Sequence, residues 1–145
     1  MKATSNISDA DERLLSELKK ESVFISESLM GRGYPDGWVS ANVQKIGLTD
    51  GRYILNTTKL AEAAALNYST AKSLFGATNH FFVFFEDREG KVLNLGICGF
   101  GALNVQNMSA DICENVTINA QALVRTERLV YHNRAVKMVV YTFRI

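Results

Sequence analysis

The sequence has little proline, histidine or cysteine, little net charge and no long apolar run. Its 145 residues include one proline, two histidines and two cysteines, and the formal net charge is +1. A charge this small gives no global attraction to nucleic acid or to an anionic membrane. No run of about 18 apolar residues is present, so the chain as given does not span a bilayer, and no signal peptide follows Met1. We therefore expect a cytosolic protein or the soluble portion of a longer one.

The composition is that of an ordinary folded domain. Apolar residues make up 47% of the chain and charged residues 21%, which are typical values for globular proteins. A chain of this length can bury a real core. Because no low-complexity tract or linker divides it, we expect one domain over residues 1–145.

Residues 79–87, NHFFVFFED, form the most informative stretch of the chain. Aromatic and β-branched residues favour a pleated sheet, and so short an apolar run between turn residues predicts a strand. Phenylalanines fall on both faces of this strand, so we expect both faces to be covered and the strand to be central in its sheet. The run Glu86-Asp87-Arg88-Glu89 that follows, which is mostly acidic, predicts a solvated hairpin turn, with weak Ca²⁺ binding as an alternative.

A long amphipathic helix is expected at the start of the chain, from about Asp9 to Met30. Its apolar stripe has mostly i, i+4 spacing and comprises Leu14, Leu18, Ile25 and Leu29. A helix of this length, about 33 Å, either packs across a sheet or is the lower half of a longer helix. The glycines of residues 31–38 end it, and Trp38 is expected to be a packed anchor and not a ligand platform.

The remainder, residues 43–145, is expected to form a sheet domain with a short helical insert over residues 57–75. A cysteine loop over residues 96–115 lacks clear periodicity. The fold class is therefore α+β: a long N-terminal helix packed on a mostly antiparallel sheet of about five or six strands. Strands are predicted over residues 43–49, 52–55, 81–85, 92–95, 118–131 and 135–143.

The two cysteines, Cys98 and Cys113, allow two interpretations. They are either two buried thiols, since free cysteine behaves as a small hydrophobe, or a disulfide that closes a loop of about 15 residues. The pair alone does not decide between them, because the compartment is unknown.

Acceptor triplets for N-glycosylation bear on the compartment. Five Asn-x-Ser/Thr triplets occur, whereas the composition predicts about 1.4 by chance. This excess favours an exported protein with a glycosylation-compatible surface, and a disulfide is favoured with it. Asn and Thr also serve as helix caps, and residues 56–58 lie where a cap is expected. The candidate acceptors are Asn6, Asn56, Asn67, Asn107 and Asn115.

No catalytic constellation can be assembled from the sequence. His80 and His132 have no Cys or His partner at metal-ligand spacing, and no base is evident beside Cys98. Residues 96–101, GICGFG, lack the lysine and Ser/Thr of a phosphate-binding loop. We expect no enzyme, cofactor, metal or nucleic-acid partner. The basic residues near the C-terminus are expected to blunt a sheet edge or to face water: Arg125, Arg128, Arg134, Lys137 and Arg144.

The order of several short segments resembles a known family. The segments are GYPDGW (33–38), IGLTDG (46–51), NTTKL (56–60), YSTAKSLFG (68–76), FFVFFE (81–86), ERLV (127–130) and VKMVVY (136–141). In this order and composition the chain, from Leu29 onward, looks like the soluble domain of archaeal type IV pilin-like surface proteins.

The resemblance implies a non-enzymatic cell-surface protein, a filament subunit or minor pilin. In this family a hydrophobic N-terminal helix, processed by a prepilin-type peptidase, inserts in the membrane and forms the filament core. That segment and its processing site are missing here, so the helix over Asp9–Met30 is expected to be its surviving lower part. The implied partners are other pilin-like subunits, which contact the protein through the N-terminal helix that is largely absent here. The implied location is extracellular, with membrane contact only through the missing segment.

Two other classes of function stay open. The first is an extracellular adhesin or sugar-binding module that uses residues 96–115, and the second is an intracellular α+β domain with a small-molecule pocket. A disulfide would favour the extracellular classes, whereas separated, reduced cysteines would favour the intracellular one.

Overall fold

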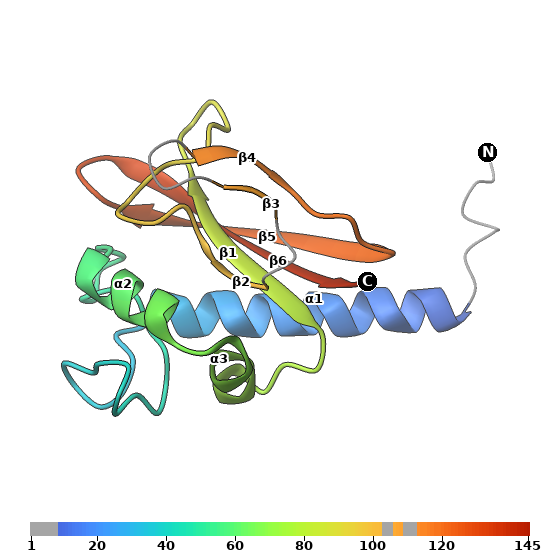
Figure 1. Ribbon diagram of the computed structural model, residues 1–145, viewed down its shortest axis with the longest axis horizontal. Helices are drawn as coiled ribbons and strands as arrows, with labels where there is room; N and C mark the ends of the chain where they lie inside the picture. The colour runs from blue at the N-terminus through green and yellow to red at the C-terminus, as the bar shows by residue number, and fades with distance from the viewer. Residues whose placement is uncertain (1–8, 103–105, 109–112) are drawn as a thin grey trace.

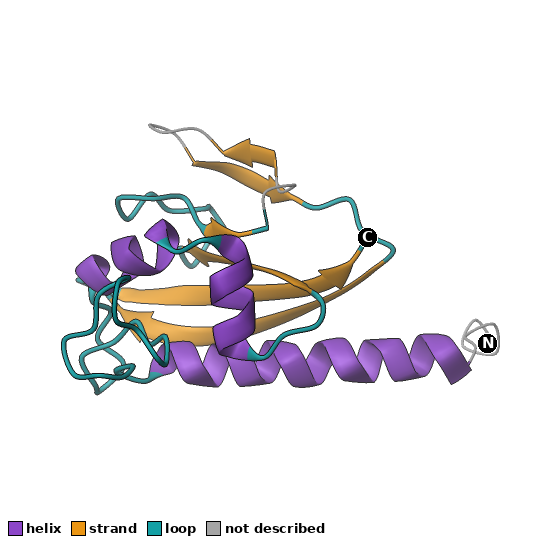
Figure 2. Cartoon of the chain, turned by 60° about the horizontal axis from the view of Figure 1, so that its bottom comes forward, coloured by secondary structure: helices purple, strands orange, loops and turns teal. Residues whose placement is uncertain are grey.

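The computed structural model describes residues 9–102, 106–108 and 113–145 of the chain. Three layers are visible in Figures 1 and 2: a long helix, a curved sheet above it, and a smaller ribbon of strands beyond the sheet. The elements are α1 (Asp9–Met30), α2 (Thr57–Ala65), α3 (Tyr68–Phe75), β1 (His80–Glu86), β2 (Phe100–Gly101), β3 (Gln106–Met108), β4 (Cys113–Thr117), β5 (Ala122–Tyr131) and β6 (Ala135–Arg144).

The α+β class and the N-terminal helix are confirmed, but the predicted strand number is wrong. Among the described residues the main sheet has four strands in the order β2-β1-β6-β5, all antiparallel, and β3 pairs with β4 separately. The segments 43–49, 52–55 and 92–95, predicted as strands, make only isolated bridges. Backbone groups of the first segment bond to other elements: the Leu48 N–H donates to the Leu29 carbonyl of α1, and the Thr49 carbonyl accepts from the Lys59 ammonium.

Strand β1 is central, as predicted, and it is buried on both faces. It pairs with β2 on one side and with β6 along its full length on the other. Phe81, Val83 and Phe85 point into the core that α1, α2 and α3 cover. Phe82 and Phe84 point into a second core on the opposite face, which includes both cysteines.

Helix α1 is fixed to the sheet by apolar and polar contacts. Leu18, Ile25 and Leu29 are fully buried. Ser22, also fully buried, donates its hydroxyl to Thr126 Oγ1 of β5 at 2.6 Å. The Thr142 hydroxyl of β6 donates to the Leu18 carbonyl at 2.7 Å. Buried polar groups with partners fix the position of the helix along the sheet more specifically than apolar packing alone.

The N-terminal turns of α1 extend beyond the sheet. Residues 11–17 are exposed except for the half-buried Leu14, and continuous burial begins only at Leu18. Leu15 continues the buried stripe of the helix but is 39% exposed. Figure 1 shows the N-terminal turns of α1 extending past the ends of the strands. None of the helices in the described part of the chain is long and apolar enough to cross a membrane.

The connection between α1 and α2 is held by buried groups from three segments. Trp38 is 2% exposed, and its indole N–H donates to the Gly47 carbonyl at 3.1 Å, which confirms the packed-anchor interpretation. A Cβ at Gly47 would lie 2.3 Å from the Gly33 nitrogen, so only glycine fits this crossing. The buried Lys59 ammonium donates to the carbonyls of Arg32 and Thr49 and lies 3.5 Å from the Asp50 carboxylate.

The sequence predicted that Glu86 lies in a solvated turn, but the structure places it in β1, inside the sheet. Its residue is 8% exposed, and its carboxylate binds the Arg125 guanidinium at 2.6 Å and lies 3.6 Å from the Lys137 ammonium. The three side chains come from β1, β5 and β6, so the ion pairs connect three strands on one face. Of the basic residues expected to face water, four form ion pairs: Arg125, Arg128, Lys137 and Arg144.

The burial boundary in α1 predicts where truncation is costly. Leu29→Ala should lower the free energy of unfolding by about 2–5 kcal/mol, because it leaves a cavity beneath the sheet. Leu15→Ala, beyond the sheet, should change it by no more than about 0.5 kcal/mol. Urea unfolding followed by circular dichroism measures both, and equal losses in the two variants would contradict the boundary.

Candidate functional site

A cleft lies between the helical insert and the first two strands of the sheet. It has a volume of about 520 Å³ and is open to solvent on one side. Helices α2 and α3 form one wall, and β1, β2 and the residues beside them form the other. Its lining residues are Ala63, Ala64, Leu66, Asn67, Tyr68, Ala71, Phe81, Phe82, Gly99, Phe100, Gly101 and Ala102.

Glycines bring the cysteine loop close to β1 at the floor of this cleft. A Cβ at Gly99 would lie 2.7 Å from the Phe82 ring, and one at Gly101 would lie 2.4 Å from the Phe81 carbonyl oxygen. Both glycines also have positive φ, which L side chains rarely adopt. The glycine-rich sequence GICGFG therefore serves close backbone packing in this structure.

Tyr68 and His80 form the polar pair beside the cleft. Tyr68 Oη lies 2.9 Å from His80 Nδ1 and also accepts the Phe81 backbone N–H at 3.3 Å. The His80 ring is stacked with the rings of both Tyr68 and Phe143. Burial, together with the nearby Lys72 charge, lowers the pKa of His80, and burial raises the pKa of Tyr68. Both shifts favour the neutral forms of the two side chains.

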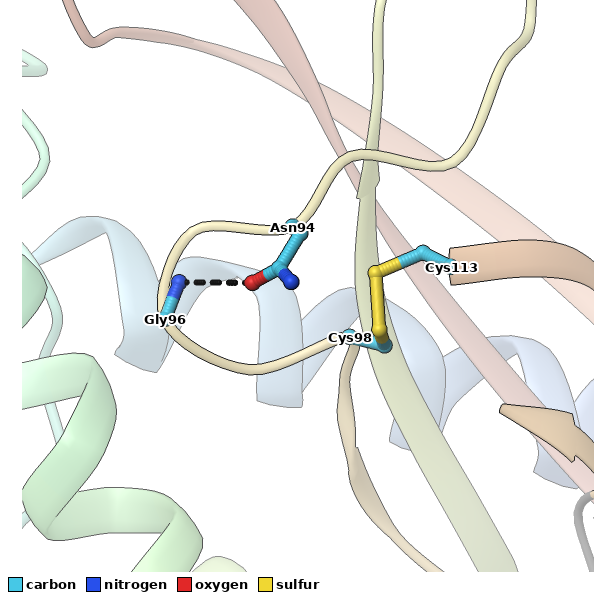
Figure 3. Close-up of a disulfide and its surroundings, with 4 residues drawn as sticks. All are labelled: Asn94, Gly96, Cys98 and Cys113. Atoms are coloured by element: carbon cyan, nitrogen blue, oxygen red, sulfur yellow. Dashed lines mark hydrogen bonds between the residues drawn. A yellow bond between two sulfur atoms is a disulfide. The ribbon is translucent and has the colours of Figure 1, made fainter. Parts of the chain in front are cut away.

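Cys98 and Cys113 form a disulfide, which confirms that alternative over the two free thiols. The sulfur atoms are 1.99 Å apart and the Cα atoms 5.4 Å apart. The bridge joins the segment before β2 to the start of β4 (Figure 3) and packs against Phe82 and Phe84 in the second core. Beside it, Asn94 Oδ1 accepts the Gly96 backbone N–H at 2.9 Å. The disulfide therefore closes the cysteine loop on itself, and apolar packing holds the bridge against the sheet.

The structure describes the side chains of two of the five candidate acceptor asparagines. Asn56 is the N-cap of α2 and Asn67 is the N-cap of α3. The two triplets therefore also serve as helix caps, as the sequence had suggested for residues 56–58. Asn6 and the side chains of Asn107 in β3 and Asn115 in β4 lie outside the described residues.

The groups that carry most metal and acid–base chemistry are not gathered in one place. His80 begins β1 opposite Phe143, near the end of β6, whereas His132 lies in the turn that precedes β6. The two histidines are therefore at opposite ends of the sheet. Within the described residues, no three His, Cys, Asp or Glu side chains are grouped so that they could hold a metal ion.

Comparison with known proteins identifies no relative. No known protein family, curated protein or solved structure matches the chain. The function must therefore be argued from the arrangement of its own elements.

Several residues of this region were missed by sequence reasoning. Tyr68 and Lys59 were assigned only to helical segments, and Glu86 only to a turn. Their polar partners come from distant parts of the chain, as in the pairs Tyr68–His80 and Glu86–Arg125. No local pattern indicates such partners, but an ionisable residue that directly follows an apolar run, as Glu86 follows Phe85, is a usable signal for a buried pair.

The disulfide predicts a measurable loss of stability on its removal. Cys98→Ser combined with Cys113→Ser should lower the free energy of unfolding by about 3 kcal/mol, because a loop with a sequence separation of 15 residues is no longer closed in the unfolded chain. Reductant should destabilise the wild type by a similar amount in urea unfolding and leave the double variant unchanged. If reductant also destabilised the double variant, its effect on the wild type would not come from the Cys98–Cys113 disulfide.

The environment of His80 predicts how stability depends on pH. The folded pKa is below the usual 6.5, so the unfolded chain binds the proton more readily between these two values. The free energy of unfolding should therefore decrease as the pH falls through this window, and His80→Gln should remove the decrease. Urea unfolding between about pH 7.5 and about pH 5 measures this. The same slope in wild type and variant would be the contrary result.

Proposed function

We propose that this chain is the soluble domain of a type IV pilin-like filament subunit or minor pilin, a non-enzymatic protein of the cell surface. The observation that carries the proposal is the form of α1. Its C-terminal half is packed across an antiparallel sheet, and its N-terminal turns extend beyond the sheet with their apolar stripe uncovered. A helix held at one end and free at the other is suited to lateral packing against helices of neighbouring subunits.

The side chains of the extending turns fit this role. Leu14 is half-buried and Leu15 is 39% exposed, so the stripe that is fully buried at Leu18 continues into solvent. Acidic and basic residues surround it, including Glu12 and Arg13. An apolar stripe with charged flanks is the pattern by which helices associate and choose partners. In the proposed full-length protein, an apolar segment preceding α1 inserts in the membrane and continues this helix.

The disulfide supports a location outside the cytosol. Cytosolic thiols are kept reduced, whereas disulfides persist in extracellular and cell-surface proteins. The bridge lies with β3 and β4 on the side of the sheet opposite α1 (Figure 1), where it would face outward from a filament whose core is built from the helices. The intracellular small-molecule-binding alternative is disfavoured for this reason.

The cleft beside Tyr68 favours a second candidate, an extracellular adhesin or ligand-binding module. Its volume of about 520 Å³ is in the range of small-molecule sites. The two candidates share a location and differ in whether the protein assembles through α1.

Assembly through α1 can be tested in the cells that produce the protein. An antibody against this domain is used to follow it after the cell surface is sheared and filaments are sedimented. We expect the wild type in the filament fraction and Leu15→Glu largely absent from it, because a charge is placed on the helix stripe. Leu129→Glu is the matched control: Leu129 is 64% exposed on β5, away from α1, and this variant should sediment normally.

The other outcomes separate the alternatives. Surface-bound protein that never sediments, whichever variant is used, would contradict the filament role and favour the ligand-binding module. Recovery of the wild type from the cytosol with reduced cysteines would contradict both extracellular candidates.

A further inference from the structure

Two of the acceptor triplets can be compared directly, because both begin with the N-cap of a helix. In each, the asparagine Oδ1 accepts a backbone N–H of the first helical turn: Lys59 N for Asn56 and Ser69 N for Asn67. The atom that becomes glycosylated is the other one, the amide nitrogen Nδ2. The two asparagines differ at that atom.

The amide nitrogen of Asn56 is already used. It donates to the Asp50 carboxylate at 2.9 Å, and this hydrogen bond is the largest cause of the lowered pKa of Asp50. The same carboxylate lies 3.5 Å from the buried Lys59 ammonium, and Asn56 itself is half-buried. A sugar on this nitrogen would disturb the cluster that joins Asp50, Asn56 and Lys59, and the folded chain presents the nitrogen poorly to an enzyme.

The amide nitrogen of Asn67 is free by the same criteria. Oδ1 accepts both the backbone N–H of Ser69 at 2.9 Å and the Ser69 hydroxyl at 2.7 Å. Two donors on Oδ1 fix the carboxamide with its oxygen toward α3, so Nδ2 is directed away from the helix. Asn67 and Ser69 are exposed, and Nδ2 donates no hydrogen bond within the described part of the chain.

We propose that Asn67 is a glycan attachment site, and that the folded chain discriminates in its favour against Asn56. The inference rests on the proposed function, since only an exported chain meets the glycosylation machinery. In the transfer, Nδ2 loses one proton and bonds to C1 of the first sugar of a polyprenyl-phosphate-linked donor, and the lipid phosphate leaves. Oδ1 keeps both of its hydrogen bonds, so the cap of α3 survives the modification.

The position of Asn67 gives the glycan a second consequence. Asn67 lines the cleft, next to Leu66 and Tyr68. A sugar on Nδ2 therefore stands at the rim of the cleft and limits access to its apolar wall. Large ligands are excluded from the glycosylated protein.

Acceptor use can be measured on the purified, unmodified chain. The folded protein is incubated with an oligosaccharyltransferase that accepts the plain Asn-x-Ser/Thr triplet and with its lipid-linked donor. Peptide mass spectrometry then gives the occupancy of each triplet. We expect at least about tenfold more glycan on Asn67 than on Asn56, because the Asn56 nitrogen must first leave a charged partner. After reduction and unfolding, the two occupancies should become similar.

Variants of the third residue provide matched controls. Ser69→Thr keeps the hydroxyl and should keep the modification, whereas Ser69→Ala and Asn67→Gln should abolish it at this triplet only. Ser69 is exposed, so these variants fold. A folded chain left bare at Asn67, or modified equally at Asn56, overturns the proposal.

The protein isolated from its own cells separates this inference from the proposed function. Glycan on Asn67 in surface protein supports both. Bare Asn67 in surface protein overturns the glycosylation alone, and bare Asn67 in protein confined to the cytosol overturns the proposed function together with it.

Discussion

The structure depends on the burial of β1 on both of its faces. Alternate phenylalanines of this strand enter two different cores, one beneath α1, α2 and α3 and one beneath the disulfide. A strand with apolar groups on both faces is stable only when both are covered, and that requires a layer on each side of the sheet. The long helix supplies one layer, and the Cys98–Cys113 bridge with β3 and β4 supplies the other. The cleft lies where the helical insert and the start of this second layer meet β1 and β2.

Buried polar groups fix the layers relative to one another. Ser22 connects α1 to β5, Lys59 connects α2 to the chain that follows α1, and Glu86 connects β1 to β5 and β6. Each of these groups would be costly if it were left without a partner. No described buried side-chain nitrogen or oxygen lacks a hydrogen-bond partner. Apolar packing therefore brings the layers together, and these polar contacts determine their registration.

The two ends of the molecule have different characters. At one end α1 leaves the sheet with part of its apolar stripe exposed, and at the other the short, capped helices α2 and α3 form one wall of the cleft. Each cap asparagine has two functional atoms in its side-chain amide. The oxygen Oδ1 caps the helix, and the nitrogen Nδ2 remains for a partner outside the helix. At Asn56 the nitrogen binds Asp50, and at Asn67 it is left to solvent.

The sequence by itself determined the local features of this protein. The i, i+4 stripe predicted α1 with its observed bounds, and the phenylalanine run predicted a central strand. The helix-forming composition of residues 57–75 predicted the helical insert. These predictions were possible because each signal lies within a single element. The tertiary structure alone decided the rest. Residues 43–55 have strand-like composition but join the main sheet only through the bridge of Ile54 to Tyr131, whereas Leu48 and Thr49 bind α1 and Lys59. Glu86 is buried because β5 and β6 bring Arg125 and Lys137 to it. The same holds for the disulfide, for the cleft, and for the difference between Asn56 and Asn67. Each depends on which distant residues the fold brings close together, and the local sequence does not encode those contacts.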